Sequence, residues 1–328
     1  MQLAIGVTSG MKLEHILKLS AVAEKQGLSR MWIGDDISAP HDVFVSASAI
    51  LLKFKKLHVG IGVTSPLVRN ISTIARAAAS LSEIGGHKRF TLGLGVGGLQ
   101  DLRRLGINAT NPRDMLRNAT ALLNAALKGE TVMFIKGNFN LTRYRARYAS
   151  EHEVPIFFGV RGPKLLSLAG EISDGVILSG PKTYVRKAVS LVHEAIRTSG
   201  RSAKNFRFVV WVPTVLVKRS GDLKLVKSTV AFVLADTPRE VLELAGLRYD
   251  DINEIREVYQ KRGIDGASRL ITGSLLDEVA IYGDSPKILD EFEMLRESGI
   301  HEVVFGPPYG IRPEAAVNEL AESWRRYS

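Results

Sequence analysis

The 328-residue chain contains no cysteine. This absence excludes disulfide bonds, zinc sites built on thiolates, iron–sulfur clusters held by cysteine, and cysteine nucleophiles. The seven histidines are scattered, and no two of them have the i, i+4 spacing of a zinc site on a helix. We therefore expect no metal site.

The chain also lacks an apolar stretch of about 20 residues without charge, so no membrane span is expected. Residues 1–15 have no basic region before their apolar run and do not resemble a signal peptide, which predicts a cytoplasmic protein. The net charge is +10, but the basic residues are spread along the chain and no nucleic-acid-binding module accompanies them. They form either a solvated surface or a basic entrance that attracts an anionic ligand. We expect no nucleic-acid partner.

Apolar segments of strand length alternate with segments of helical periodicity along most of the chain. The segments with strand character are residues 3–7, 30–35, 57–63, 89–97, 154–160, 174–180, 206–213 and 301–307. Strands without strict polar alternation, separated by helices, are typical of a parallel sheet covered on both faces. Eight such units predict an α/β fold of the (β/α)8 TIM barrel type, with an open doubly wound sheet as the alternative.

Two stretches interrupt this alternation. Residues 131–150 alternate around a Gly-Asn pair, which predicts a hairpin-like excursion. Residues 221–298 have helical periodicity and predict a helical insertion between the seventh and eighth strands. No break in the sequence starts a second domain, so we expect residues 1–328 to form a single barrel domain with these insertions.

Glycines gather where the predicted strands end. The segment GIGVTSP (60–66) ends the third strand, GLGVGG (93–98) the fourth and GVRGP (159–163) the fifth. In a TIM barrel the active site lies at the carboxyl ends of the strands. Glycine at these ends allows a ligand to approach the backbone closely and to bind peptide N–H groups.

The segment 159–163 precedes a predicted helix that starts near Pro163. Its backbone amides and the helix dipole favour a phosphate, and Arg161 or Lys164 adds positive charge. The alternative is a tight turn with proline at the first helical position. GLGVGG loosely matches the dinucleotide fingerprint G-x-G-x-x-G, which is a weak signal when it stands alone.

Asp35 and Asp36 form a carboxylate pair at the end of the second predicted strand. Carboxylates in this position accept hydrogen bonds from ligand hydroxyls or take part in proton transfer. The alternative is that they cap the segment that follows.

Four segments taken together resemble a known family. They are IGVTSPLVRN (61–70), RFTLGLGVGG (89–98), VPIFFGVRGPKLLSLAGEISDGVILSG (154–180) and GIHEVVFGPPYG (299–310). The sequence resembles the luciferase-like flavin and deazaflavin oxidoreductases and, among them, the coenzyme F420-dependent methylenetetrahydromethanopterin reductases. The resemblance extends from residue 3 to about residue 325 and is weakest in 215–280.

The resemblance implies a (β/α)8 barrel with insertions that binds coenzyme F420, a deazaflavin with a phosphate and an acidic tail. Gly62-Val63 matches a non-prolyl cis peptide that backs the deazaflavin ring, and the two residues that follow match polar positions beside the ring. Residues 159–163 match the loop near the coenzyme phosphate. The implied cofactor-binding residues are Asp35, Gly62, Val63, Thr64, Ser65, Gly95, Gly97, Gly98, Gly159, Val160, Arg161, Gly162 and Pro163.

The chain departs from this family at three positions. Asp36 stands where the family usually has histidine, and Gly6 and Gly98 stand where the reductases carry carboxylates that are candidates for protonating the pterin. Cofactor binding is therefore easier to carry over than substrate chemistry. Asp36 is our candidate catalytic residue, as a proton donor in place of the missing carboxylates.

The sequence thus predicts an F420-dependent oxidoreductase that transfers a hydride between the deazaflavin and 5,10-methylenetetrahydromethanopterin or a related pterin. Two alternatives stay open: an FMN-dependent luciferase-like monooxygenase, and a non-catalytic protein that binds a flavin or deazaflavin. The expected partners are a small-molecule substrate, a tetrahydropterin in the first interpretation, and a second copy of the chain, because the family commonly forms homodimers.

Overall fold

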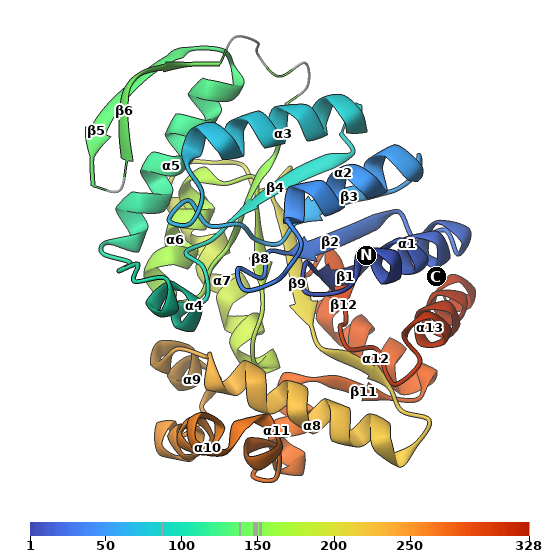
Figure 1. Cartoon of the computed structure of the whole chain (residues 1–328). Helices are drawn as coiled ribbons and strands as arrows, with labels where there is room; N and C mark the ends of the chain where they lie inside the picture. Colours follow the sequence, from blue (N-terminus) through green and yellow to red (C-terminus); the bar gives the residue numbers. More distant parts are fainter. Residues whose placement is uncertain (87, 138, 147–149, 151–152, 328) are drawn as a thin grey trace.

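Eight parallel strands close into a barrel at the centre of the molecule (Figure 1). The computed structural model describes residues 1–86, 88–137, 139–146, 150 and 153–327. The barrel strands are β1 (Gln2–Thr8), β2 (Arg30–Gly34), β3 (His58–Ile61), β4 (Phe90–Leu94), β7 (Ile156–Gly159), β8 (Gly175–Leu178), β9 (Arg207–Val212) and β12 (Glu302–Phe305). Strand β1 pairs with both β2 and β12, so the sheet has no edge. The TIM barrel prediction is confirmed, and the open doubly wound alternative is wrong.

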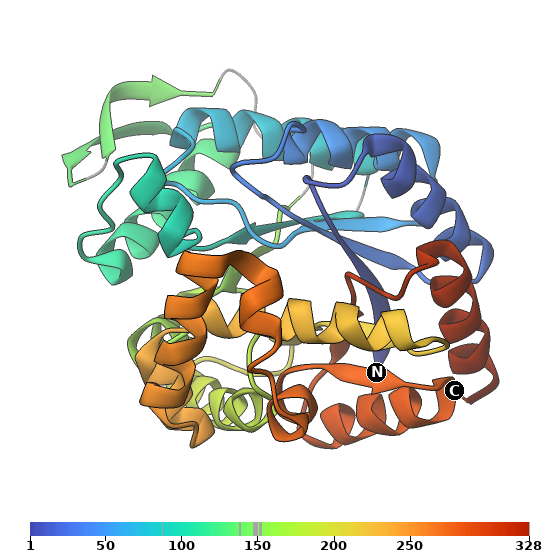
Figure 2. The same ribbon diagram turned by 60° about the horizontal axis from the view of Figure 1, so that its bottom comes forward.

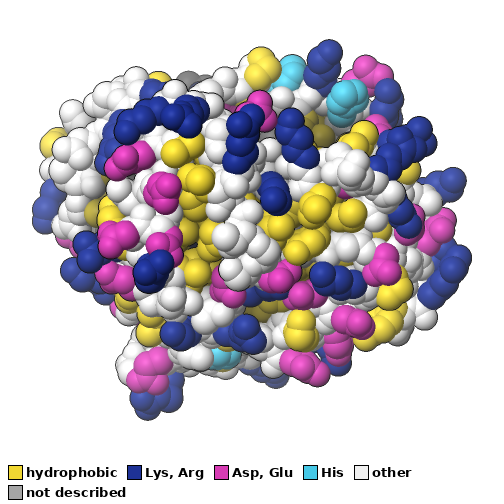
Figure 3. Space-filling model, turned by 90° about the horizontal axis from the view of Figure 1, so that it is seen from below, with side chains coloured by type: hydrophobic (Ala, Val, Ile, Leu, Met, Phe, Trp, Pro, Cys, Tyr) yellow, Lys and Arg dark blue, Asp and Glu magenta, His cyan; other side chains and the backbone are white. Residues whose placement is uncertain are grey.

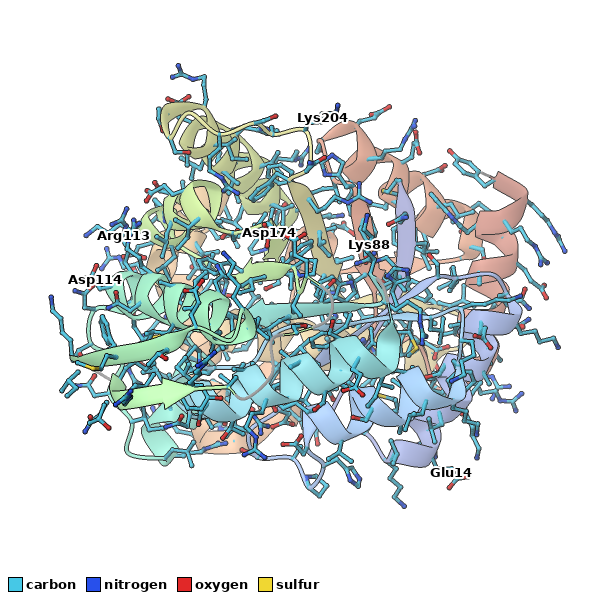
Figure 4. The ribbon with its side chains drawn as sticks, turned by 90° about the horizontal axis from the view of Figure 1, so that it is seen from above. Glu14, Lys88, Arg113, Asp114, Asp174 and Lys204 are labelled. Carbon is cyan, nitrogen blue, oxygen red and sulfur yellow. The ribbon has the colours of Figure 1, made fainter. Side chains whose placement is uncertain are left out.

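A ring of helices surrounds the barrel. These helices are α1 (Leu13–Lys25), α2 (Val43–Lys53), α3 (Ile71–Gly85), α5 (Pro112–Leu127), α6 (Pro163–Ile172), α7 (Lys182–Thr198), α12 (Ser285–Glu297) and α13 (Pro313–Tyr327). Asp42, Asn70 and Asp284 accept hydrogen bonds from backbone N–H groups in the first turns of α2, α3 and α12, which have no other intrahelical partner. In Figure 4, Glu14 in the first turn of α1 and Lys204, which precedes β9, lie on opposite sides of the molecule. Glu14 follows the carboxyl end of β1, and Lys204 precedes the amino end of β9. Helix α1 therefore starts at the carboxyl ends of the strands, as the barrel topology requires.

Strand side chains alternate between the barrel interior and the surrounding helices. The interior cluster consists of Ala4, Trp32, Phe157, Ile177, Val209 and Val304. Toward the amino ends of the strands, Glu302 accepts a hydrogen bond from Trp32 Nε1 at 2.5 Å and pairs with Arg30 Nε at 2.9 Å. The Glu302 side chain is 2% exposed. These two partners satisfy a charge whose burial alone would be strongly unfavourable.

Between β4 and β7 the chain leaves the barrel. The short helix α4 (Leu99–Arg104) follows the fourth strand, and β5 (Thr131–Lys136) and β6 (Phe139–Arg145) then form an antiparallel two-stranded sheet at the upper left of Figure 1. The hairpin-like excursion predicted at 131–150 corresponds to this sheet, and part of that stretch lies outside the described residues. The sequence did not predict α4.

Between β9 and α12 the chain forms a layer outside the ring of helices, in the lower part of Figures 1 and 2. The layer consists of α8 (Ser220–Ala235), α9 (Arg239–Ala245), α10 (Tyr249–Ser268), α11 (Gly273–Val279) and the parallel pair β10 (Thr214–Leu216) and β11 (Ile281–Gly283). It has a buried hydrophobic cluster of its own. The helical insertion predicted at 221–298 falls here, but the two strands were not predicted. Its last helix, α12, belongs to the ring because it packs against β12 and α13.

Charged side chains of both signs cover the surface. Seen from the side of α8–α11, Lys and Arg side chains lie along the upper rim of the face and hydrophobic side chains gather in its middle (Figure 3). Among the described residues, no helix is long and apolar enough to cross a membrane. Nor do the residues that the structure covers include a group of three or more His, Asp or Glu side chains that could hold a metal ion.

His58, at the start of β3, predicts an acid-sensitive step in stability. Burial, with the charges of Arg30 and Arg89 beside it, lowers the pKa of His58 to about 4. An unfolded histidine has a pKa of about 6.5. Between these two pH values His58 is protonated in the unfolded chain but neutral in the folded chain. The free energy of unfolding therefore falls as the pH drops from about 6.5 toward 4. We expect His58→Asn to reduce this loss, measured as the free energy of urea unfolding at pH 7 and pH 4.5.

The matched control is His15→Asn, because His15 is exposed on α1. This variant should retain the full difference between the two pH values. An equal pH dependence in wild type and His58→Asn would show that His58 is not the responsible group.

Candidate functional site

One level of the barrel interior carries almost no side chains. It lies two residues beyond the interior cluster toward the carboxyl ends of the strands, because inward-facing positions recur at every second residue. Its members are Gly6, Gly34, Gly62, Gly95, Gly159, Ser179, Trp211 and Gly306. We call these eight positions the glycine level. Its six glycines leave room beside the backbone at the end of the barrel where TIM barrels bind their ligands, although Gly6, Gly95 and Gly306 are themselves buried.

Val63 fills one half of the glycine level. The Gly62–Val63 peptide bond is cis, which is the position that the family resemblance implies. A Cβ atom on Gly95 or on Gly159 would lie 2.5 Å from a methyl carbon of Val63. Only glycine fits at that distance, so these two glycines are required for the Val63 side chain to occupy this place.

Thr64 and Ser65 are buried, and both use their hydroxyl groups inside the protein. Gly95 N donates to the Thr64 carbonyl at 3.0 Å, so the chain pairs with the end of β4. Thr64 Oγ1 donates to Asp35 Oδ2 at 2.7 Å, and Ser65 Oγ donates to the Val96 carbonyl at 2.6 Å. Both hydroxyl groups therefore fix the conformation of the loop that follows β3. This loop borders the mouth of the barrel, by which we mean its opening at the carboxyl ends of the strands.

The Asp35 carboxylate links the end of β2 to the loop that follows β3. Besides Thr64, it binds Arg69, whose Nε and Nη2 atoms each donate to it at 3.0 Å. Arg69 Nη1 also donates to Asp42 Oδ2 at 2.6 Å. The side chain of Asp35 is 5% exposed and that of Arg69 is 22% exposed. Burial lowers the pKa of Arg69, but its hydrogen bonds to Asp35 and Asp42 and their charges raise that pKa overall, so the guanidinium stays charged.

Asp36 lies next to this network, but its side chain is exposed. Its backbone N–H donates to Ser9 Oγ at 2.9 Å, and its Oδ1 atom accepts from the backbone N–H of Ser38 at 3.0 Å. Asp36 Oδ2 lies 3.0 Å from the place where a Cβ on Gly10 would stand. The carboxylate is thus held at the rim in contact with solvent.

The segment GLGVGG leads from β4 into α4. Gly97 has φ +102°, a conformation that favours glycine, and a Cβ there would lie 3.4 Å from Ser65. Gly98 directly precedes α4, and a Cβ on it would lie 3.1 Å from Asp101 Oδ2. The Asp101 carboxylate therefore stands beside the position at which the family resemblance implies a missing carboxylate. The closed barrel lacks the open βαβ sheet that a dinucleotide fingerprint requires.

Residues 159–163 lead from β7 into α6. Gly162 has φ +89°, and α6 begins at Pro163, so a helix N-terminus is present where the sequence predicts an anion site. Arg161 Nη2, however, pairs with Asp236 Oδ2 at 2.8 Å, at the end of α8 in the outer layer. This ion pair was not predicted from the sequence. The carboxylate of Asp236 balances the positive charge of Arg161 that the sequence led us to expect at the anion site.

The structure brings several of the predicted site residues into contact, but it buries the side chain of one of them in the core. Residues 62–65 contact the loop 95–98, and Val63 extends the contact to Gly159. Val160, in contrast, is buried in the hydrophobic core between barrel and helices. Its side chain therefore serves packing, and only its backbone belongs to the loop.

Arg69 and Trp211 are absent from the residues predicted from the sequence. Trp211 lies in the predicted strand 206–213, and the alternation of inward positions from Val209 is the signal that identifies it. Its Nε1 atom donates to the Gly306 carbonyl at 2.6 Å. Arg69 carries no such signal, because its pairing with Asp35 exists only in the folded chain.

Two cavities lie away from the glycine level. One of about 300 Å³ lies between α12 and α13, and one of about 200 Å³ lies between residues 66–71 and β6. Neither is lined by the strand-end glycines. The candidate site is therefore recognised from strand register and chemistry.

Replacing Asp35 tests whether the carboxylate network holds the mouth together. Asp35→Asn removes the charge that Arg69 binds with two donors, and we expect the free energy of unfolding in urea to fall by about 2 kcal/mol. Thr64→Val removes a single hydroxyl bond to the same carboxylate and should cost about 1 kcal/mol. If Asp35→Asn is as stable as wild type, the network does not stabilise the fold.

The sequence of the chain matches a known family. A sequence model of the family described as luciferase-like monooxygenase matches residues 2–302. The 5,10-methylenetetrahydromethanopterin reductase of Methanolobus tindarius is 30% identical over 317 residues, which cover 95% of this chain and 95% of that protein. The enzyme of the same name from Archaeoglobus fulgidus is 28% identical over 306 residues, covering 91% and 90%.

Solved structures share the fold. The coenzyme F420-dependent tetrahydromethanopterin reductase from Methanopyrus kandleri matches with a TM-score of 0.87 at 23% identity, covering 100% of this chain and 99% of that one. An F420-dependent secondary alcohol dehydrogenase in complex with an F420–acetone adduct matches with a TM-score of 0.78 at 19% identity, covering 98% and 97%. Because the family model matches most of the chain and the relatives align over nearly their whole length, the chain belongs to the luciferase-like monooxygenase family.

Proposed function

We propose that the protein is a coenzyme F420-dependent oxidoreductase that transfers a hydride between the deazaflavin and a methylenetetrahydropterin. The observation that carries the proposal is the glycine level, whose glycines leave room for Val63 and Trp211 to form a floor at the carboxyl ends of the strands. The family, and the relatives named 5,10-methylenetetrahydromethanopterin reductase, support the choice of cofactor and substrate.

The residues at the strand ends fit a flat ring that carries an anionic group. Gly62 and Val63, which the family resemblance places behind the ring, and Gly95 beside Val63 would lie against the ring. The two glycines leave the space into which Trp211 and Val63 pack. The amides at the start of α6 would bind the phosphate, and the guanidinium of Arg161 would contribute only with the donors that its pair with Asp236 leaves available. When bound, the deazaflavin supplies the carbon that gives or accepts the hydride.

Asp36 is the proposed proton donor. Reducing a methylene bridge between two nitrogens adds a hydride to the carbon, breaks one carbon–nitrogen bond and gives the released nitrogen a proton. In its protonated form, the exposed Asp36 side chain at the rim would deliver that proton directly or through a water molecule and would itself become the carboxylate. Ser9 and Ser38 hold Asp36 in place through its backbone and its Oδ1 atom.

The proposed function is tested by titrating the purified protein with F420 and, separately, with FMN while following absorbance. We expect saturable binding of F420 and none of FMN. With reduced F420 and 5,10-methylenetetrahydromethanopterin, the absorbance of oxidised F420 should then appear. Binding of FMN alone would favour the luciferase-like monooxygenase, and binding of F420 without turnover would favour a different substrate or a non-catalytic binding protein.

The role of Asp36 is tested with Asp36→Asn, which keeps the shape of the side chain but cannot donate a proton. We expect kcat to fall by about 10²-fold, within the range for loss of a general acid, while the F420 dissociation constant stays unchanged. Glu14→Gln, on the outer face of α1, is the control and should retain wild-type kcat. Wild-type turnover in Asp36→Asn would assign the proton transfer to another group.

The oligomeric state and the cytoplasmic location stay predictions from the sequence. We propose that the chain forms a homodimer or a higher homo-oligomer, as its family commonly does. Light scattering on the purified protein would establish its molecular mass in solution.

A further inference from the structure

Trp211 crosses the barrel at the glycine level. In the closed sheet the strand order is β1-β12-β9-β8-β7-β4-β3-β2, so β9 and β3 stand on opposite walls. Trp211 starts from β9, yet a Cβ on Gly62, just beyond β3, would lie 2.9 Å from its Cζ3 atom. The indole therefore reaches across the full width of the barrel.

Two features fix the orientation of this ring. A Cβ on Gly6 would lie 2.4 Å from Cζ2 and 2.7 Å from Nε1 of Trp211, so the ring lies where only glycine leaves space. The Nε1–H donates to the Gly306 carbonyl at 2.6 Å, which prevents the ring from turning about its long axis. A large side chain held by close packing and one directed hydrogen bond is well ordered.

Trp211 and Val63 divide the glycine level between them. Val63 packs against Gly95 and Gly159, whereas Trp211 packs against Gly6 and Gly62. Both side chains are partly buried and pack on the interior cluster. Together they form the floor on which a ligand at the strand ends would rest.

We propose that Trp211 is a positioning residue that supports the Gly62–Val63 segment from the opposite wall and sets the place of the deazaflavin ring. The proposal rests on the proposed function. Hydride transfer requires the two reacting carbons to approach closely in one orientation, and a displacement of about 1 Å can slow a reaction by about 10²-fold. Loss of the indole would let Gly62–Val63 move toward the space it leaves, and the ring would follow.

The test compares Trp211→Leu, Trp211→Phe and Gly6→Ala with wild type. Trp211→Leu cannot span the barrel, and we expect its kcat to fall by about 10²-fold. Its F420 dissociation constant should rise by no more than about tenfold. Trp211→Phe keeps a ring but loses the bond to Gly306, so its kcat should be intermediate. Gly6→Ala keeps Trp211 but pushes its indole ring out of position, so its kcat should also fall.

The absorbance spectrum of the bound coenzyme is the second readout, because it reports the surroundings of the ring without any turnover. It should shift between wild type and each of the three variants. Trp324→Leu is the control for a general loss of packing, since Trp324 lies on α13 and packs against the core between barrel and helices, whereas Trp211 packs on the interior cluster. It should lower the unfolding temperature but change neither kcat nor the bound spectrum.

The outcomes separate the inference from the proposed function. If Trp211→Leu and Gly6→Ala retain wild-type kcat and the wild-type spectrum and lose only stability, as Trp324→Leu does, Trp211 is merely structural and the inference is wrong. If Trp211→Leu does not fold, the other two variants decide. If wild type binds F420 but does not reduce the pterin, the substrate proposal fails and the spectrum still tests Trp211. If wild type binds no F420, both fail.

Discussion

A closed barrel of eight strands encloses a column of space, and inward-facing side chains have to fill it at every level. Near the amino ends of the strands, the Glu302 carboxylate and its partners fill it, and above them lies an apolar cluster. Six of the eight positions of the glycine level are glycine and supply no side chain. Its Trp211 and the neighbouring Val63 fill it from opposite walls. Trp211 requires glycine at positions 6 and 62, and Val63 requires it at positions 95 and 159. The geometry of the mouth follows from this constraint.

The polar residues around the mouth mainly bind one another. Asp35 receives hydrogen bonds from Thr64 and Arg69, and Ser65 binds a carbonyl of the neighbouring loop. These loops are ordered by the protein itself, which reduces the conformational entropy that a ligand has to remove on binding. Asp36 differs, because its carboxylate is exposed to solvent at the rim. The proposed hydride transfer needs alignment and a single proton, and these two features would serve it.

The barrel strands could be predicted because each is an apolar run between helices of clear periodicity. Strands β10 and β11 could not, since each has three residues and β10 follows β9 after only one residue, so one apolar run conceals two strands. At the candidate site, glycine at successive strand ends indicated the segments that form the glycine level. The pairs Asp35–Arg69 and Arg161–Asp236 join residues 34 and 75 positions apart. Such contacts exist only once the chain has folded, so no local pattern indicates them.

At the six glycines of the glycine level, a substitution can only increase the volume of the side chain. Glycine is the smallest residue, so every substitution at its six glycines adds volume and none removes it. Within this level, room for a larger ligand can be gained only by shortening Val63, Trp211 or Ser179. A substitution at any of these six glycines therefore fills space at this level, whereas only three side chains can be shortened to open it. The loops that follow the strands are not limited in this way, because their side chains can become either larger or smaller.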